Sequence, residues 1–144
     1  MSIETLVKAI QDNCAEYDLF NPPGASSEAV AQVAADFERE FQHPLPDAYR
    51  RLLLASDGIL ENGLTIWPCA TYWEFHESIL SANHDLRENV SDDFLYFGQR
   101  DDSVFVMELA TGRYLAIELN GLAEWEEFPD CETMIEFMLE RALD

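Results

Sequence analysis

Three short apolar runs, close together in the second half of the chain, constrain its fold more than any other feature. They are residues 94–98, 104–107 and 114–117. Each is rich in aromatic or β-branched side chains, as strands are. Only short turn-forming segments separate them, Asp101-Asp102 and then residues 110–113. Connections this short join antiparallel neighbours, because parallel strands need a long crossover. The sequence therefore predicts an antiparallel β-meander, to which residues 124–128 can add a fourth strand.

Most other apolar residues follow the spacing of helices. They recur at every third or fourth position in the segments 3–17, 30–41 and 134–142. This spacing gathers apolar side chains on one face and predicts an amphipathic helix in each segment. Ser26 or Ser27 can cap the second helix, because a serine hydroxyl accepts a hydrogen bond from an N–H group of the first turn.

Shorter elements are expected between the second helix and the meander. A short helix is predicted over residues 47–56, and Gly58 stands where a C-terminal helix cap needs a positive φ. Residues 64–67 have the composition of a short strand. Pro68 ends that strand, because proline cannot donate to a strand ladder.

The pattern Thr71-x-x-Glu74 is typical of a capping box and predicts a helix that begins there and continues to residue 86. The order along the chain is thus helices, then a meander, then a closing helix. Such segregation indicates an α+β fold, with the meander flanked by N-terminal helices and a C-terminal helix. The length suits one domain, and we expect residues 1–144 to form it.

The chain is strongly acidic, with 29 Asp and Glu residues against 8 Lys and Arg and a formal net charge of −21 at pH 7. Such charge is typical of disordered chains, but 48% of the residues are hydrophobic, which is enough to build a core. The charge repels nucleic acids and anionic membranes, so neither is an expected partner, and it attracts a basic protein. Residues 73–144 hold 18 of the acids, so an acidic surface is expected there. Composition alone leaves solubility and a basic partner as open explanations.

The cysteines and the first residues bear on the compartment. Cys14, Cys69 and Cys131 are an odd number at wide spacing without a CxxC pair, as is typical of reduced, partly buried thiols. Residues 1–5 contain no basic stretch followed by an apolar run. No apolar segment is long enough to span a bilayer. We therefore expect a cytoplasmic protein.

No constellation in the sequence indicates catalysis, a metal or a cofactor. The motifs of serine hydrolases, nucleotide-binding loops, zinc proteases and EF-hands are missing. His76 and His84 fall eight residues apart on one expected helix, without the i, i+4 spacing of a metal pair. Paired acids can act in acid–base catalysis or bind a hard cation, but acids in turns commonly stabilise the turn itself. No enzyme, metal site or cofactor is expected.

Residues 44–58 resemble the signature of the SUKH superfamily, which has a Leu-Pro pair, a Tyr with an apolar cluster, and a short polar stretch that ends in Gly. The matching residues are Leu45, Pro46, Tyr49, Leu52, Leu53 and Gly58. Asp57 stands where many members have Asn, and Asp can form the same turn. The strand runs and the closing helix, with Phe137, extend the resemblance over about residues 27–140.

The resemblance implies a kind of function. SUKH proteins are mainly bacterial immunity proteins that bind toxins, including those of secretion systems such as type VI, and a fungal branch contains cell-wall regulators. The toxins are often nucleases or other enzymes that act on nucleic acids, which tend to be basic, in agreement with the acidic charge. The leading hypothesis is immunity by stoichiometric occlusion of a cognate basic toxin, with nucleic-acid mimicry by rows of carboxylates as a variant. An adaptor or regulator with a non-toxin partner is the alternative, and an enzyme using carboxylates with a divalent cation is a third.

Partner-binding residues are expected in or beside loops of the acidic second half, with acids steering the encounter and aromatic anchors holding the complex. The candidate acids are Asp92, Asp93, Asp101, Asp102, Glu124, Glu126 and Glu127. The candidate anchors are Trp67, Tyr72, Trp73 and Trp125, of which Trp73 and Trp125 are favoured. For each anchor, packing in the core is the competing explanation. The net charge favours a monomer, and a weak homodimer through an apolar patch stays open.

Overall fold

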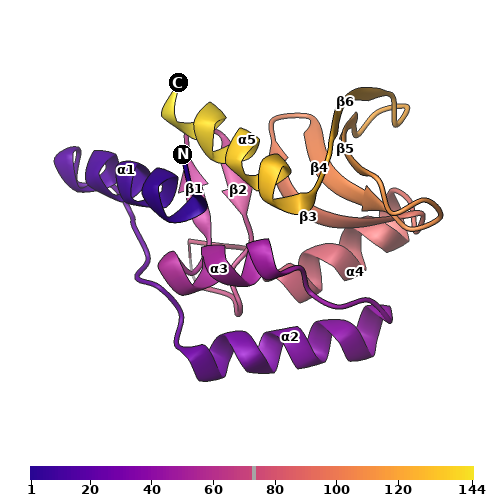
Figure 1. Cartoon of the computed structure of the whole chain (residues 1–144), viewed down its shortest axis with the longest axis horizontal. Helices are drawn as coiled ribbons and strands as arrows, with labels where there is room; N and C mark the ends of the chain where they lie inside the picture. Colours follow the sequence, from indigo (N-terminus) through magenta and orange to yellow (C-terminus); the bar gives the residue numbers. More distant parts are fainter. Residues whose placement is uncertain (73) are drawn as a thin grey trace.

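The computed structural model describes residues 1–72 and 74–144, whose elements are labelled in Figure 1. The helices are α1 (Ile3–Glu16), α2 (Ser27–Phe41), α3 (Asp47–Ala55), α4 (Ile79–Asn89) and α5 (Cys131–Leu143). The strands are β1 (Ile59–Glu61), β2 (Leu64–Ile66), β3 (Phe94–Arg100), β4 (Ser103–Glu108), β5 (Tyr114–Glu118) and β6 (Glu124–Phe128). The α+β prediction is confirmed, including the meander, its fourth strand β6 and the closing helix.

The strands form one antiparallel sheet in the order β1-β2-β3-β4-β5-β6. β1 is a strand that the apolar pattern did not predict. It forms a hairpin with β2 through Asn62-Gly63, whose φ angles of 50° and 80° are positive, as a two-residue hairpin turn requires. Asn and Gly tolerate this backbone region better than other residues.

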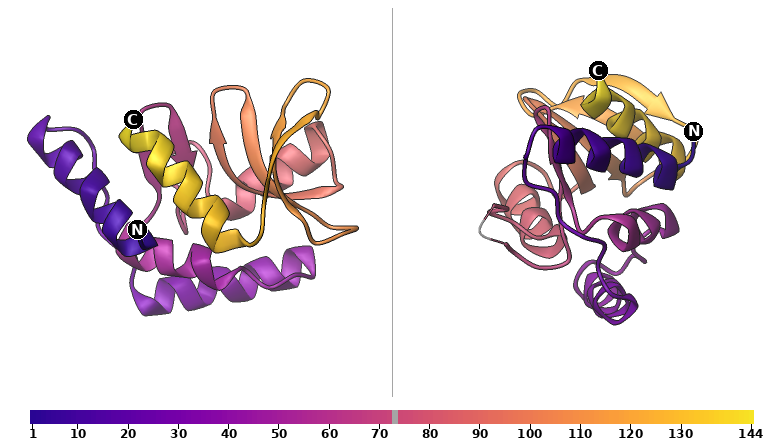
Figure 2. Two further views of the ribbon diagram at one scale, coloured as in Figure 1. Left: turned by 45° about the horizontal axis from the view of Figure 1, so that its top comes forward. Right: turned by 90° about the vertical axis from the view of Figure 1, so that its left-hand side faces the viewer.

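The helices pack around the sheet with α3 near the centre of the molecule. α5 contacts β2, β5 and β6, and it also packs against α1 and α3. Figures 1 and 2 show α1 and α5 close together, with α2 on the far side of α3. α4 packs against β3 and α2. None of the described helices combines the length and the apolar character needed to cross a bilayer.

Aromatic side chains join the central helices to the sheet. The ring of Phe97 on β3 lies 6.3 Å from that of Phe37 on α2 and 5.8 Å from that of Tyr49 on α3. All three side chains are buried, and such rings contribute most of the apolar area of a core. The Tyr49 hydroxyl donates a 2.6 Å hydrogen bond to the carbonyl of Trp67, just after β2. This bond satisfies the buried hydroxyl and ties α3 to the hairpin.

Asn83 of α4 completes the edge of β3 where β2 no longer pairs with it. β2 pairs with β3 only at Arg100 and Gln99, so the first half of β3 has no strand on that side. The Asn83 side chain accepts a bond from the Tyr96 N–H at 2.7 Å and donates to the Tyr96 carbonyl at 2.9 Å. Asn83 is fully buried. Its amide thus takes the place of a strand backbone.

The expected helix start at Thr71 is wrong, because α4 begins after Ser78. Ser78 Oγ accepts from the N–H of Ser81 at 3.1 Å, and Ser81 Oγ accepts from the N–H of Ser78 at 2.8 Å. This reciprocal pair is a capping box built from two serines, so a search for Glu or Gln at the fourth position passes over it. His76 therefore lies outside α4 and shares no helix with His84.

Two smaller expectations also change. Gly58 has the predicted positive φ, 97°, but α3 already ends at Ser56 in an extended conformation, so Gly58 forms the turn into β1 and not the helix cap. A side chain there would be only 2.9 Å from Cζ of Phe75. Tyr17, placed on the apolar face of the first helix, is its C-terminal cap residue and is mostly exposed.

Candidate functional site

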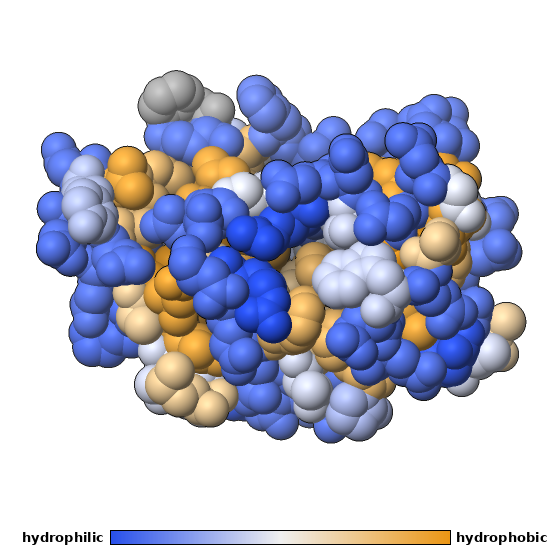
Figure 3. Space-filling view, turned by 90° about the horizontal axis from the view of Figure 1, so that it is seen from above, coloured by the Kyte–Doolittle hydropathy of each residue, from blue (hydrophilic) through white to orange (hydrophobic). Residues whose placement is uncertain are grey.

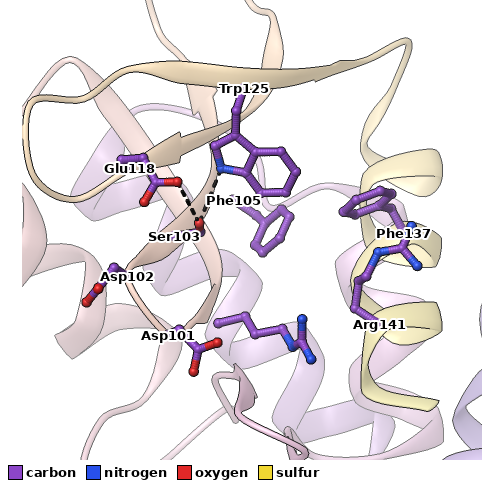
Figure 4. Close-up of a pocket in the computed structure, with 9 residues that line it drawn as sticks. Asp101, Asp102, Ser103, Phe105, Glu118, Trp125, Phe137 and Arg141 are labelled. Atoms are coloured by element: carbon purple, nitrogen blue, oxygen red, sulfur yellow. Dashed lines mark hydrogen bonds between the residues drawn. The ribbon is translucent and has the colours of Figure 1, made fainter. Parts of the chain in front are cut away.

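A pocket of about 300 Å³ opens where the β3–β4 turn, β6 and the last turns of α5 meet. Figure 4 shows side chains from these elements around it. The lining residues are Arg100, Asp101, Asp102, Ser103, Phe105, Glu118, Trp125, Phe137 and Arg141. The pocket therefore combines aromatic rings, carboxylates and guanidinium groups.

Three aromatic rings form its apolar side. The centroid of the Trp125 ring lies 6.2 Å from that of Phe105, edge to face, and 6.0 Å from that of Phe137. Phe105 is 1% exposed and belongs to the core, whereas Trp125 is 46% exposed. A tryptophan packed on its inner side and open on its outer side is typical of an interface hot spot.

A bulge in β6 turns Trp125 toward α5. In the β5–β6 ladder Ile117 pairs with Glu124 and Ala116 pairs with Glu126, so Trp125 is an extra residue without a partner. Bulges of this kind re-aim a side chain relative to the regular alternation of a strand. Trp125 consequently contacts Phe137 of α5, while β6 keeps acidic side chains on either side of it.

Hydrogen bonds hold the indole in place. Trp125 Nε1 donates to Ser103 Oγ at 3.2 Å, and Ser103 Oγ donates to Glu118 Oε1 at 3.4 Å. The three residues come from β6, β4 and β5, and Figure 4 shows these bonds as dashed lines. Because the indole N–H is satisfied inside the protein, a partner that covers the ring does not have to supply an acceptor.

Two of the chain's eight basic residues line the pocket, Arg100 and Arg141. The guanidinium carbon of Arg141 lies 4.3 Å from the centroid of the Phe137 ring, a cation–π contact, and its Nη1 lies 3.1 Å from Asp144. Arg100 donates from Nε to the carbonyl of Asn62 at 3.3 Å. Asn62 also donates to the carbonyl of Asp144 at 3.0 Å, so the β1–β2 turn is tied to the end of α5.

Some of the candidate acids gather at this pocket. Asp101 and Asp102 form the β3–β4 turn, and Asp101 has a φ of 55°, which Asp tolerates. Figure 4 shows Asp102 directed away from the rings. The structure thus brings Asp101, Asp102 and Trp125 together at one end of the sheet.

The acids of β6 are divided between two environments. Arg113 lies 2.9 Å from Glu124, 3.1 Å from Glu127 and 3.3 Å from Glu108. The pKa of Glu108 is lowered, first by its bond from Thr111 and then by Arg113. The bonds that Arg113 donates to its carboxylate partners, Glu124 first, raise the pKa of its guanidinium. Glu126 is exposed, and its carboxylate lies outside this cluster.

The other candidates lie elsewhere. Asp92 and Asp93 are exposed before β3, at the opposite end of that strand from Asp101. Trp67 is buried in the core at 5% exposure. Tyr72 is 38% exposed, and its hydroxyl donates to Asp57 at 2.5 Å. Burial, and then that bond, raise the pKa of Tyr72 to about 12. Trp73 lies outside the described residues.

Several pocket residues were not among the sequence candidates, namely Arg100, Ser103, Phe105, Glu118, Phe137 and Arg141. One signal in the sequence pointed to two of them. Residues 73–144 contain only four basic residues, and Arg100 and Arg141 are two of those. The other two, Arg87 and Arg113, lie outside the pocket, so the scarcity of basic residues narrows the choice without deciding it.

The described residues contain little that suggests catalysis. In residues 1–72 and 74–144 no three His, Cys, Asp or Glu side chains gather as metal ligands. Burial raises the pKa of Cys14, Cys69 and Cys131 to about 12, which keeps the thiols protonated and weakly nucleophilic. His84 lies 2.5 Å from Glu40 and stacks on Phe41, a contact between α4 and α2.

Seen from the side on which α5 lies in Figure 1, the surface is mostly hydrophilic, with small hydrophobic areas between polar side chains (Figure 3). Scattered exposed apolar groups are ordinary on any protein. The half-exposed tryptophan in a formed pocket is a more specific feature than these areas.

Comparison with known proteins decides the family. The model of the SMI1 / KNR4 family (SUKH-1) matches residues 24–140. The chain belongs to this family. The resemblance found in the signature around Tyr49 is therefore confirmed, and the match includes every lining residue of the pocket except Arg141. Comparison with curated proteins gave no match. SUKH proteins are generally non-enzymatic immunity proteins or regulators that bind protein partners.

Proposed function

We propose that this SUKH protein is a cytoplasmic immunity protein that binds a cognate basic toxin and neutralises it by stoichiometric occlusion. Membership of the family supports the class of function. The net charge of −21 supports a basic partner, because long-range attraction speeds the encounter of oppositely charged proteins. No turnover is required, since a bound inhibitor blocks an active site or a substrate groove by occupying it.

The half-exposed Trp125 in the pocket at the end of the sheet is the observation that favours this pocket as the binding surface. Affinity in protein interfaces comes mainly from a few desolvated anchors, among which tryptophan is enriched. Asp101, Asp102, Glu124 and Glu126 surround this anchor in the turn and on β6. Rim acids of this kind act on the rate of association and on partner choice more than on affinity.

The test is co-expression with the product of each adjacent gene, scoring rescue of growth and copurification of a stable complex. The expected result is one toxic neighbour whose effect this chain suppresses and which it retains during purification. Trp125→Ala should weaken that complex by about 2 kcal/mol or more, the range of a hot spot. Tyr17→Ala is the matched control, because Tyr17 is a 69% exposed aromatic residue at the C-terminal cap of α1, outside the pocket. A toxic neighbour that is neither bound nor neutralised would contradict the proposal.

A second candidate is an adaptor or regulator that binds a non-toxin protein, since the family also contains regulators. The same pocket would serve as its anchor. The neighbouring genes distinguish the two functions, because an immunity protein has to be produced together with its toxin. Copurification of a non-toxic partner through Trp125 would favour the regulator.

A further inference from the structure

Most basic residues of this chain already have a carboxylate partner. Lys8, Arg39, Arg51, Arg113 and Arg141 are in ion pairs. Among residues 1–72 and 74–144, Arg50, Arg87 and Arg100 have no carboxylate oxygen within 4.0 Å, although acidic residues outnumber basic ones by 29 to 8, and of these three only Arg100 lines the pocket. Arg100 donates from Nε to the Asn62 carbonyl, and this bond does not use the two terminal amino groups of the guanidinium. This unpaired guanidinium lines the aromatic pocket.

We propose that the pocket receives a carboxylate side chain, Asp or Glu, of the partner protein, which Arg100 and Arg141 bind while Trp125 covers the adjoining apolar part. The inference rests on the proposed function and names the group that enters the site. A guanidinium presents a planar fork of N–H donors that matches the two oxygens of a carboxylate, and such charge-assisted bonds are among the strongest in proteins.

The environment of the pocket favours this occupant over a basic one. Glu118 already accepts a bond from Ser103. Asp102 is directed away from the rings in Figure 4. The Asp101 carboxylate lies over the β1–β2 turn, 3.4 Å from the position that a Cβ on Gly63 would take. Three carboxylates line the pocket beside two guanidinium groups, but Glu118 is already bonded and Asp102 is directed away. An incoming carboxylate therefore meets the unused amino groups of Arg100 beside apolar rings. The rings exclude water on one side, which strengthens the electrostatic interaction.

A carboxylate on a basic partner inverts the charge pattern of the rest of the interface. Nearly all attractive pairs would join basic residues of the partner to acidic residues of this chain. Because the acidic residues are many, such pairs can form in several relative positions of the two proteins. One reversed pair in a pocket fixes the register and rejects partners that present a base at that point, because like charges in contact are costly. The pocket is thus a determinant of which toxin is recognised.

The test uses three capped dipeptides, leucyl-glutamate, leucyl-glutamine and leucyl-arginine, each N-acetylated and C-amidated, together with acetate at equal concentration. Binding is followed by NMR through the Trp125 indole N–H, assigned with Trp125→Phe, and the Arg100 Nε–H. The glutamate peptide should shift both signals with millimolar affinity, at least about fivefold tighter than the neutral glutamine isostere, since its bonds are charge-assisted. Acetate, which lacks the apolar part, should bind more weakly than the glutamate peptide.

Variants of two matched arginines complete the test. Arg100→Gln should remove most of the preference for glutamate over glutamine, because only Arg141 then remains, and Arg100→Lys should retain more of it. Arg50→Gln should change nothing, because Arg50 also donates from Nε to a backbone carbonyl at 3.3 Å but lies outside the pocket. Four outcomes would each overturn the proposal. The glutamine peptide or acetate binds as tightly as the glutamate peptide, the arginine peptide binds more tightly than the glutamate peptide, or none of them shifts the two signals. None of these outcomes depends on a toxin, so a failure here leaves the co-expression result standing by itself.

Discussion

Asn83 offers the sharpest test of how this fold is held together. The change is Asn83→Ala, which removes the side chain that pairs with both backbone groups of Tyr96. Each of those buried groups then lacks its partner, at about 1–3 kcal/mol per group. The carbonyl of Ile79 loses a bond from Asn83 Nδ2 as well, but helical carbonyls keep their backbone partner. Alanine returns about 0.5 kcal/mol through its higher helix propensity.

The expected loss is therefore about 2–5 kcal/mol of unfolding free energy, a large part of the stability of a typical domain. For a chain of this size the melting temperature should fall by about 5–15 °C. Urea and thermal unfolding, followed by circular dichroism, measure both quantities. Asn13→Ala on the exposed face of α1 is the control, because it carries the propensity change alone.

A loss below about 1 kcal/mol for Asn83→Ala would refute the reasoning, since it would show that the edge of β3 needs no side-chain partner. Asn83→Asp provides a second measurement. It keeps an acceptor for the Tyr96 N–H but cannot donate to the Tyr96 carbonyl when ionised, and burial raises the pKa of a carboxyl group. Its deficit relative to the wild type should therefore shrink as the pH falls and the protonated group regains a donor.

Three other predictions follow from single contacts. Gly24→Ala should cost more than about 2 kcal/mol in urea unfolding, because its Cβ would lie 2.0 Å from the backbone oxygen of Leu54; a cost below about 1 kcal/mol would contradict this. The pKa of Glu4 is lowered to about 2, chiefly by its bond from Arg51, so its contribution is present above pH 4.5 and is lost as the pH falls toward 2. Glu4→Gln should accordingly cost less than about 1 kcal/mol at pH 7, since the pair is half exposed, and clearly less at pH 2, as compared by thermal unfolding at both pH values. Glu126→Lys should slow association with a basic partner at low salt without changing stability, and stopped-flow rates that do not respond to the substitution would count against steering.

Periodicity and turn chemistry were enough to predict the architecture. The runs at 94–98, 104–107 and 114–117 correspond to β3, β4 and β5. Their connections are too short to join parallel strands, so the strands pair in an antiparallel way. β1 has only three residues, too few to show alternation, and Asn62-Gly63 was its one clear signal. The start of α4 was misplaced because the chain offers two possible capping boxes, Thr71 with Glu74 and Ser78 with Ser81, and the helix uses the second. The segment after Thr71 instead places the Tyr72 hydroxyl on Asp57.

The site was only partly predictable for a different reason. Trp125 and the acids Asp101 and Asp102 stood out by residue type and by their place beside loops. Their meeting with Phe137 depends on the bulge in β6 and on the path of α5, which are properties of the tertiary structure. The order of residues does not show that two arginines far apart in the sequence line the same pocket. Only the fold brings Arg100 and Arg141 together.

The bulged acidic strand β6 also has a consequence for the behaviour of the protein in concentrated solution. It is an edge of the sheet, and an exposed edge is a template on which a second sheet can grow. Here Glu124, Glu126 and Glu127 repel an approaching copy, and the bulge at Trp125 interrupts the row of backbone groups that such a copy would need. That protection is electrostatic in part, and it weakens as the pH approaches the sequence pI of about 4.1. The same strand therefore keeps copies of the protein apart at neutral pH and allows them to associate under acid conditions.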